Sequence, residues 1–515
     1  MVPGSLLAAL ALLLWTGAVL AAEGKASPEE LARQLSATPV EVRREAAHQL
    51  QRLGPAAKPA LPALIKALDD PDQQVWAQSI AAIAQLGPAA VAALPALLEG
   101  LEPSQSKGRR ERERAQTITR SAYALSRLGP VAIPRLIAAL ESGDSAVRAG
   151  AARALGGMGP EARAAVPALR AQLGHREGLV RREIVDALGQ IGPAAVAPLI
   201  EALSWNEPAQ RTSAALALGQ IGRPAQAAAD PLEKLLARES DPLVRAAALA
   251  ALPKISPDPG RVMPLLVAGL KSEHEAIRSA ATGALLAVRP ASAAIAALLP
   301  LLQEKDAAVV QRAVRVLGRF GSAVQAATPE LVAFALRQKP PPPALLEVLV
   351  QLGAAAAPEL LAACAGQEPG AFPREHWLVQ ALKSIGEPAL PALTAALGDA
   401  RLGVRFAAVR TLGEFGLAAR ASVPALLPLT ADPDPRVRAM SLGTLAAARV
   451  EASVLLPKLA AALGDPVPVV RLTAVQLVPY LGEEGAVLDD RVRVATKDPD
   501  AAVRAAARAL VEAPK

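Results

Sequence analysis

The sequence predicts an all-α fold, a solenoid of about fifteen stacked helix pairs, and two observations lead to it. First, one sequence motif recurs along the chain: a Val-Arg pair, Ala-rich apolar residues, then Leu-Gly or Ile-Gly, often followed by Pro. Most copies lie 30 to 34 residues apart, and one step is 42 residues. Second, 52% of the residues are hydrophobic but only 2% are aromatic. Repeats of this period are small units that bury their apolar faces only against neighbouring units. The Val-Arg pairs are Val42-Arg43, Val147-Arg148, Val180-Arg181, Val244-Arg245, Val404-Arg405, Val437-Arg438 and Val470-Arg471.

Each unit is expected to contain two helices. The second begins at the Val-Arg pair, and in the fourth unit Val147, Ala151 and Leu155 recur at helical spacing and form one apolar stripe. Gly159 supplies the left-handed stop, and Pro160 cannot continue the helix. The first helix is shorter and carries a Pro, which suits its first turn or a kink. The turn between the two helices is polar and often acidic, and its Asp residues favour helix N-caps.

This pattern resembles the HEAT repeat, and its Val-Arg-x-x-Ala-Ala-x-Ala-Leu-Gly phrasing is similar to the HEAT-like repeats of phycobilin lyases. The resemblance covers residues 28–515 and implies a right-handed α-solenoid of HEAT-like helix pairs. It also implies a ladder between layers, formed by the turn Asp and the second-helix Arg. The matching pairs are Asp399 with Arg405, Asp432 with Arg438, Asp465 with Arg471 and Asp498 with Arg504, while Asp70 has no Arg of its own. The Arg position is held by Trp76, Ile118, Val310, Pro342 and Glu375 in other units.

The amino terminus is expected to direct export. Residues 6–20 form an uncharged apolar run, and the small residue Ala21 suits signal-peptidase cleavage. We therefore expect residues 1–21 to be a signal peptide of an exported bacterial-type protein, periplasmic or extracellular, followed by a leader segment at 22–27. The first five residues carry no Lys or Arg, and an uncleaved anchor is the alternative. Beyond residue 27 no stretch is expected to be long and apolar enough to span a bilayer.

The residues that carry enzyme and metal chemistry are sparse. The single cysteine, Cys364, excludes an internal disulfide and any multi-cysteine metal site, and its apolar setting predicts a buried small hydrophobe. No metalloprotease, nucleophile-elbow or P-loop motif is present, and no two His share a metal-ligand spacing. We therefore predict no catalytic residue, no cofactor and no metal site.

Two places break the repeat. Around residues 101–116 an extra charged stretch that includes Arg109 and Arg110 predicts either a charged loop, open to partner docking, or an early start to the next helix. Around residues 338–373 the chain contains Pro340, Pro341, Pro342 and Pro343. Because prolines cannot continue a helix, we expect one disrupted layer and a bend there.

Two sets of side chains are candidates for partner binding. Arg312, Arg315 and Arg319 lie at spacings of three and four on one second helix and share a face. The resemblance implies that second helices line the concave side, and a plain solvated basic stripe is the alternative. Trp76, Trp205 and Trp377 fall at or near turns that enter second helices, where they would form a rim of interface anchors. Alternatively, Trp76 fills an Arg position by packing.

These observations favour a non-enzymatic exported scaffold that binds a protein partner through the concave face and loop edges. The formal net charge of +7 suits an anionic partner, such as an acidic protein, polysaccharide or lipid headgroup. Export argues against nucleic acid. Two alternatives remain: a bilin lyase-like chromophore-handling protein, suggested by the repeat phrasing, and a cytosolic nucleic-acid-binding HEAT protein if the leader is misread.

Overall fold

The computed structural model describes residues 26–101, 111–338, 340–366 and 376–512, without the side chains of residues 111–115. Within these ranges the secondary structure is entirely α-helix and 3-10 helix, and the α-helices form fifteen successive pairs. The predictions of an all-α solenoid and of about fifteen helix pairs are therefore confirmed. The chain divides into two compact units, unit 1 at residues 1–284 and unit 2 at residues 285–515.

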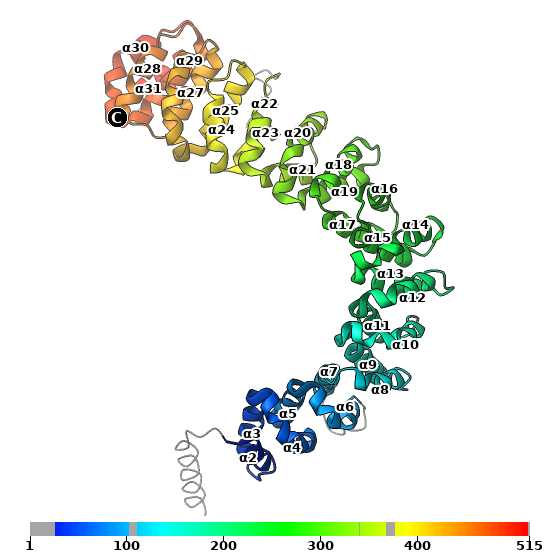
Figure 1. The fold of residues 1–515 in the computed structure, drawn as a ribbon. Coiled ribbons are helices and arrows are strands. Elements are labelled where there is room, and N and C mark those ends of the chain that lie inside the picture. Colours follow the sequence, from blue (N-terminus) through cyan, green and yellow to red (C-terminus); the bar gives the residue numbers. More distant parts are fainter. Residues whose placement is uncertain (1–25, 102–110, 339, 367–375, 513–515) are drawn as a thin grey trace, which may run out of the picture. The chain divides into compact units, whose positions relative to one another are not determined.

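In unit 1 the first and second helices of successive pairs form two rows. Figure 1 shows α9, α11, α13 and α15 along one side and α8, α10, α12 and α14 along the other. The first helices are α2 (Pro28–Gln34), α4 (Leu61–Lys66), α6 (Leu94–Glu99), α8 (Ile133–Ala139), α10 (Val166–Ala171), α12 (Val196–Ala202), α14 (Ala229–Arg238) and α16 (Pro259–Leu270). The second helices are α3 (Val40–Leu53), α5 (Gln73–Leu86), α7 (Glu111–Arg127), α9 (Ser145–Gly157), α11 (Gly178–Ile191), α13 (Pro208–Ile221), α15 (Pro242–Ile255) and α17 (Glu275–Ala287), which carries the boundary between the units.

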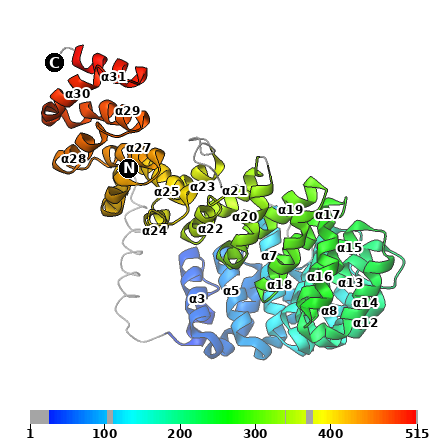
Figure 2. The same ribbon diagram turned by 90° about the horizontal axis from the view of Figure 1, so that it is seen from above.

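Unit 2 repeats this arrangement, and Figure 2 shows its layers in succession from α20 to α31. Its first helices are α18 (Ala291–Leu298), α20 (Thr328–Arg337), α22 (Ala357–Ala362), α24 (Leu390–Ala396), α26 (Val423–Leu426), α28 (Ala452–Ala462) and α30 (Asp489–Ala495). Its second helices are α19 (Ala307–Gly318), α21 (Pro343–Gln351), α23 (Trp377–Ile385), α25 (Leu402–Phe415), α27 (Pro435–Ala447), α29 (Pro468–Leu477) and α31 (Ala501–Glu512).

The repeated sequence motif accounts for the local structure of each layer. In α9 the predicted stripe of Ala151 and Leu155 is fully buried, because neighbouring second helices cover it on both sides. Gly159 follows with a φ of +60°, a left-handed conformation that favours glycine, and ends the second helix as expected. The first-helix prolines mostly stand in the first turn, as Pro134 does in α8, where the missing N–H costs no helical hydrogen bond. Pro264 and Pro457 instead lie inside α16 and α28.

The second helices of unit 1 approach one another closely where a glycine lies at their contact. A Cβ atom built on Gly156 of α9 would lie 2.9 Å from the Cα atom of Ala187 in α11, which is closer than real Cβ contacts. The close spacing of these two helices therefore depends on glycine at this position.

The two irregular places differ in outcome. Helix α7 starts at Glu111 and has 17 residues, against 14 in α3, α5 and α11, so the early start of this helix is confirmed. Arg109 and Arg110 lie outside the described residues. At the proline run the second helix is short, since α21 has 9 residues against 14 in α11, but its layer is present. Pro342 and Pro343 form the N-cap and first residue of α21, so the run lies in the turn after α20, and α21 packs against both α19 and α23.

One prediction about membrane spans also needs correction. Two helical stretches, Gln73–Glu99 and Gly178–Ala202, are long and apolar enough to cross a membrane by length and composition, and a pair bent by 103° at residues 343–362 would make a third. They reach this length because a second helix, the following turn and the next first helix run on without a break. Of the apolar 18-residue segment within each stretch, 50% and 56% are buried inside the stack of layers.

Candidate partner-binding face

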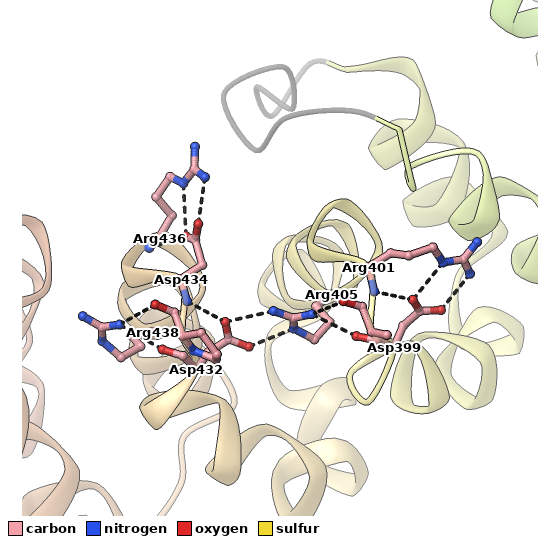
Figure 3. A network of polar contacts seen from close by, with 9 residues as sticks. Asp399, Arg401, Arg405, Asp432, Asp434, Arg436 and Arg438 are labelled. Atoms are coloured by element: carbon pink, nitrogen blue, oxygen red, sulfur yellow. Dashed lines mark hydrogen bonds and ion pairs between the residues drawn. The ribbon is translucent and has the colours of Figure 1, made fainter.

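A ladder of arginines and acids joins successive layers. The Nε and Nη2 atoms of Arg405 donate to the two carboxylate oxygens of Asp432, 27 residues later, at 2.8 and 3.1 Å. Its Nη1 atom donates to the backbone oxygen of Asp399 in its own turn at 3.0 Å (Figure 3). We call each such Arg and acid a rung, and the turn residue six positions before the Arg the acid position.

The rungs correct the pairing that the family resemblance implied. Asp399 and Arg405 meet only through the backbone oxygen of Asp399, and the carboxylate that Arg405 binds belongs to the next layer. The same shift holds for Arg438 with Asp465 and for Arg471 with Asp498. Asp70 does have a partner, because Arg43 of the preceding layer binds it at 2.7 Å.

The rungs are shielded from water. The paired side chains of Arg405 and Asp432 are 14% and 2% exposed. The hydrogen bond from Arg471 lowers the pKa of Asp498, and the hydrogen bond to Asp432 raises the pKa of Arg405. Where the Arg is missing the acid finds another partner. Asp399 binds Arg401, which lowers the pKa of Asp399 to about 2.

In the middle of unit 1 most acid positions hold a residue that is not acidic. These residues are His175, Trp205 and Ser272, in the layers after Arg148, Arg181 and Arg245 respectively, and only Arg211 finds an acid there, Glu239 at 2.7 Å. The Nε atoms of Arg148 and Arg245 are buried without a hydrogen-bond partner. His175 keeps one role of the acid, because its Nδ1 accepts the backbone N–H of Glu177. Burial, and then the positive charge of Arg148, lower the pKa of His175.

A hollow of about 410 Å³ lies on the second-helix row over α9 and α11. Arg153 of α9 spans it, and its Nε and Nη2 atoms donate to the carboxylate of Glu183 in α11 at 3.0 and 2.6 Å. The Nη1 atom of Arg153 donates to the Thr119 hydroxyl of α7 at 2.8 Å. The hydrogen bond to Glu183 raises the pKa of Arg153. The hollow is lined by Arg153, Gly156, Arg182, Glu183, Asp186, Ala187 and Gln190.

Polar and aromatic side chains extend this surface over α7 to α13. The Nε2 atom of Gln220 in α13 donates to Asp186 of α11 at 2.7 Å. Tyr123 of α7 is 61% exposed. We call Thr119, Tyr123, Arg153, Glu183, Asp186 and Gln220 the polar row. The sequence interpretation missed the polar row. Its one available signal is that Arg153 and Glu183 lie 30 residues apart, about one repeat.

The three predicted arginines lie together on α19 and its C-cap. Arg315 and Arg319 are exposed, and Arg312 is half-buried with its Nε atom buried and without a hydrogen-bond partner. Within the described residues no carboxylate lies within ion-pair distance of these guanidinium groups. We call Arg312, Arg315 and Arg319 the α19 arginines.

The two candidate tryptophans of unit 1 do not form one rim. Trp76 is 4% exposed and packs inside α5 with the Arg120 guanidinium 5.6 Å from its ring, so it fills an Arg position by packing. Trp205 is half-buried under Arg170, at 5.3 Å, and three layers separate it from Trp76. Trp377 begins α23 and stacks on His376.

The described residues bring together no group of three or more His, Cys, Asp or Glu that could hold a metal ion. Cys364 is buried as predicted, and its thiol donates to the backbone oxygen of Leu360. Burial raises the pKa of this thiol to about 12, which keeps it protonated and unreactive.

Comparison with known families identifies the repeat. The HEAT repeat model matches residues 28–118, 133–213, 166–253, 263–352, 357–446 and 391–478. Since these matches span most of the chain, it belongs to the HEAT repeat family. No curated protein matches, so the narrower similarity to phycobilin lyases stays a prediction.

Several solved structures match this chain at low identity. The karyopherin Kap121p bound to the extreme C-terminus of the protein phosphatase Cdc14p is 13% identical, with 93% of this chain and 74% of that chain covered and a TM-score of 0.43. Kap121p bound to Pho4p gives 14% identity, 93% and 73% coverage and a TM-score of 0.40. An engineered protein gives 20% identity, 82% and 99% coverage and a TM-score of 0.23. At these values the similarity bears on neither the function nor the partner of this chain.

Proposed function

We propose that this chain is a non-enzymatic, exported scaffold that binds a protein partner through its second-helix face and turn edges. The observation that carries the proposal is the polar row over α7, α9, α11 and α13. Its hydrogen bonds join neighbouring layers, so the side chains are held in place before any partner arrives. A surface fixed in advance loses little conformational entropy on binding.

The composition of the polar row suits a protein partner. Tyr and Arg are among the residues that contribute most to protein interfaces. Arg153 lies on this surface, and the exposed Tyr123 stands four residues after Thr119 on the same face of α7. The hollow beside Arg153 offers room for a side chain of the partner. Affinity would come from many modest contacts over successive layers rather than from one deep pocket.

Capture of a partner tests the proposal. The full chain, immobilised, should retain a specific protein from the extracytoplasmic fraction of its native cell. Tyr123→Ser should weaken that affinity about thirtyfold, since a central interface residue contributes about 2 kcal/mol. The matched control is Tyr480→Ser, because Tyr480 is 74% exposed outside the polar row. Equal loss in both variants, or none in either, would contradict the proposed surface.

Export is tested separately by the intact mass of the native protein. Loss of residues 1–21 from an extracytoplasmic chain is expected. A full-length cytoplasmic chain would overturn the export part of the proposal.

A further inference from the structure

We propose that the α19 arginines bind an acidic segment of a partner protein through its carboxylates. This inference rests on the proposed function and names the chemistry of the partner. The first observation is that the three guanidinium groups share one helix face at spacings of three and four residues. At a rise of about 1.5 Å per residue, they cover about 10 Å along the helix.

The second observation is that this cluster lacks the counter-charge that other arginines of the chain possess. Arg153 of α9 binds Glu183, and the arginines of the complete rungs bind Asp or Glu. Helix α19 itself contains no acidic residue, and α21, which packs against it, contains only Glu347. No ion pair joins Glu347 to the α19 arginines in the described part of the chain. The α19 arginines and Glu347 together therefore carry a net charge of +2.

The third observation is a matched position in the repeat. A Cβ atom built on Gly156 of α9 would contact Ala187 and Gln190 of α11. A Cβ atom built on Gly318 of α19 would likewise contact Val348 and Gln351 of α21. This equivalence places Arg315 at the position of Arg153, and Ala344 of α21 at the position of Glu183. The internal carboxylate found opposite Arg153 is thus replaced by an alanine opposite Arg315, and a carboxylate supplied by a partner would take its place.

Carboxylates are favoured over other anions by the geometry of the arginine contacts in this chain. Each complete rung pairs the Nε and Nη2 atoms of an Arg with both oxygens of one carboxylate. Arg315 and Arg319 are exposed, and neither guanidinium group has such a carboxylate partner within the described residues. Three arginines over about 10 Å match acidic side chains on successive turns of a partner helix.

The test uses the full chain and a fluorescent ten-residue oligoglutamate peptide. Binding should weaken with rising salt, and the triple variant Arg312→Gln, Arg315→Gln and Arg319→Gln should lower affinity at least tenfold. The matched control removes three exposed arginines from the 3-10 turns η6 (Gly159–Ala165), η8 (Arg223–Ala228) and η14 (Gly416–Ser422), namely Arg163→Gln, Arg223→Gln and Arg420→Gln. It has the same net charge and should bind within twofold of the unaltered chain.

A second variant keeps all three arginines. Ala344→Glu should supply Arg315 with an internal carboxylate, as Glu183 does for Arg153, and reduce oligoglutamate binding without removing any guanidinium group. Equal losses in the two triple variants, or none in the first, would overturn the proposal. Binding of a sulfated oligosaccharide but not of oligoglutamate at the α19 arginines would also overturn it.

These outcomes separate the two proposals. If a captured partner binds the α19 triple variant as tightly as the unaltered chain but loses affinity for Tyr123→Ser, the scaffold function stands and this inference fails. If the triple variant loses oligoglutamate while no partner protein is captured, the anionic site stands and the scaffold function fails.

Discussion

In unit 2 the ladder runs through three successive complete rungs, those of Arg405, Arg438 and Arg471. In the middle of unit 1 it is interrupted, because the acid positions in the layers after Arg148, Arg181 and Arg245 hold His175, Trp205 and Ser272. The helices and turns of the two regions are otherwise built alike. The difference shows that the layers do not need the ladder to form, because apolar packing between second helices persists where the acid is lost.

The largest expected effect comes from removing an arginine in each region. Arg405→Met leaves the carboxylate of Asp432, which is 2% exposed, buried and unpaired, and should cost about 3 to 5 kcal/mol of local stability. Arg148→Met leaves only Glu177, which is 40% exposed and 3.7 Å away, and should cost about 1 kcal/mol or less. Hydrogen exchange of α25 and of α9 measures both, since layers of a solenoid open separately. Equal costs would remove the distinction between the regions.

A gain is expected from restoring a rung. His175→Asp places a carboxylate opposite the unpartnered Nε atom of Arg148 and keeps an acceptor for the Glu177 N–H. Hydrogen exchange should show that the variant stabilises α9 and α11 by about 1 kcal/mol. His175→Asn, which adds an acceptor without a charge, is the control and should gain less. Destabilisation by the Asp variant would mean that the histidine has a packing role that the ladder comparison misses.

Ser272→Asp should produce a smaller gain. Ser272 already accepts the backbone N–H of His274, so the new side chain adds only the contact to Arg245. Unlike Arg148, Arg245 donates no hydrogen bond to its own turn within the described structure, so its guanidinium group is less well oriented for a carboxylate. We expect about 0.5 kcal/mol, measured as slower exchange in α15 and α17. A gain larger than that of His175→Asp would reverse this order.

The smallest effect is a difference in pH dependence. The pKa of His175 is lowered from 6.5, so the unfolded chain takes up the proton first and stability in α9 and α11 falls as the pH drops below 6.5. Asp399 has a pKa of about 2, lowered from 3.8, so its contribution in unit 2 is kept above pH 3.8 and lost toward pH 2. Hydrogen exchange, corrected for its intrinsic pH dependence, should show the loss in α9 and α11 first. His175→Asp should abolish that early loss, and an unchanged profile would count against the assignment.

The repeat and its helices could be predicted because they depend on neighbouring residues in the sequence. Leu155 and Gly159 lie within one helical segment, and their spacing and backbone preference predict burial and helix end directly. The effect of the prolines at 340–343 could not be predicted in detail, because a proline run that interrupts a helix and one that precedes a helix look alike in sequence. Only the position of Pro343 as the first residue of α21 distinguishes them.

The period, the helix pairs and the place of each Arg on its second helix follow from local spacing and turn chemistry, so they can be predicted from the sequence. Which side chains meet depends on contacts between layers. The sequence places Asp399 six residues before Arg405, yet the carboxylate that Arg405 binds is Asp432, brought to it by the next layer. The polar row arises in the same way, from Arg153, Glu183 and Asp186 on successive second helices. Contacts between layers depend on how one repeat packs on the next, and that packing fixes the partner of each side chain.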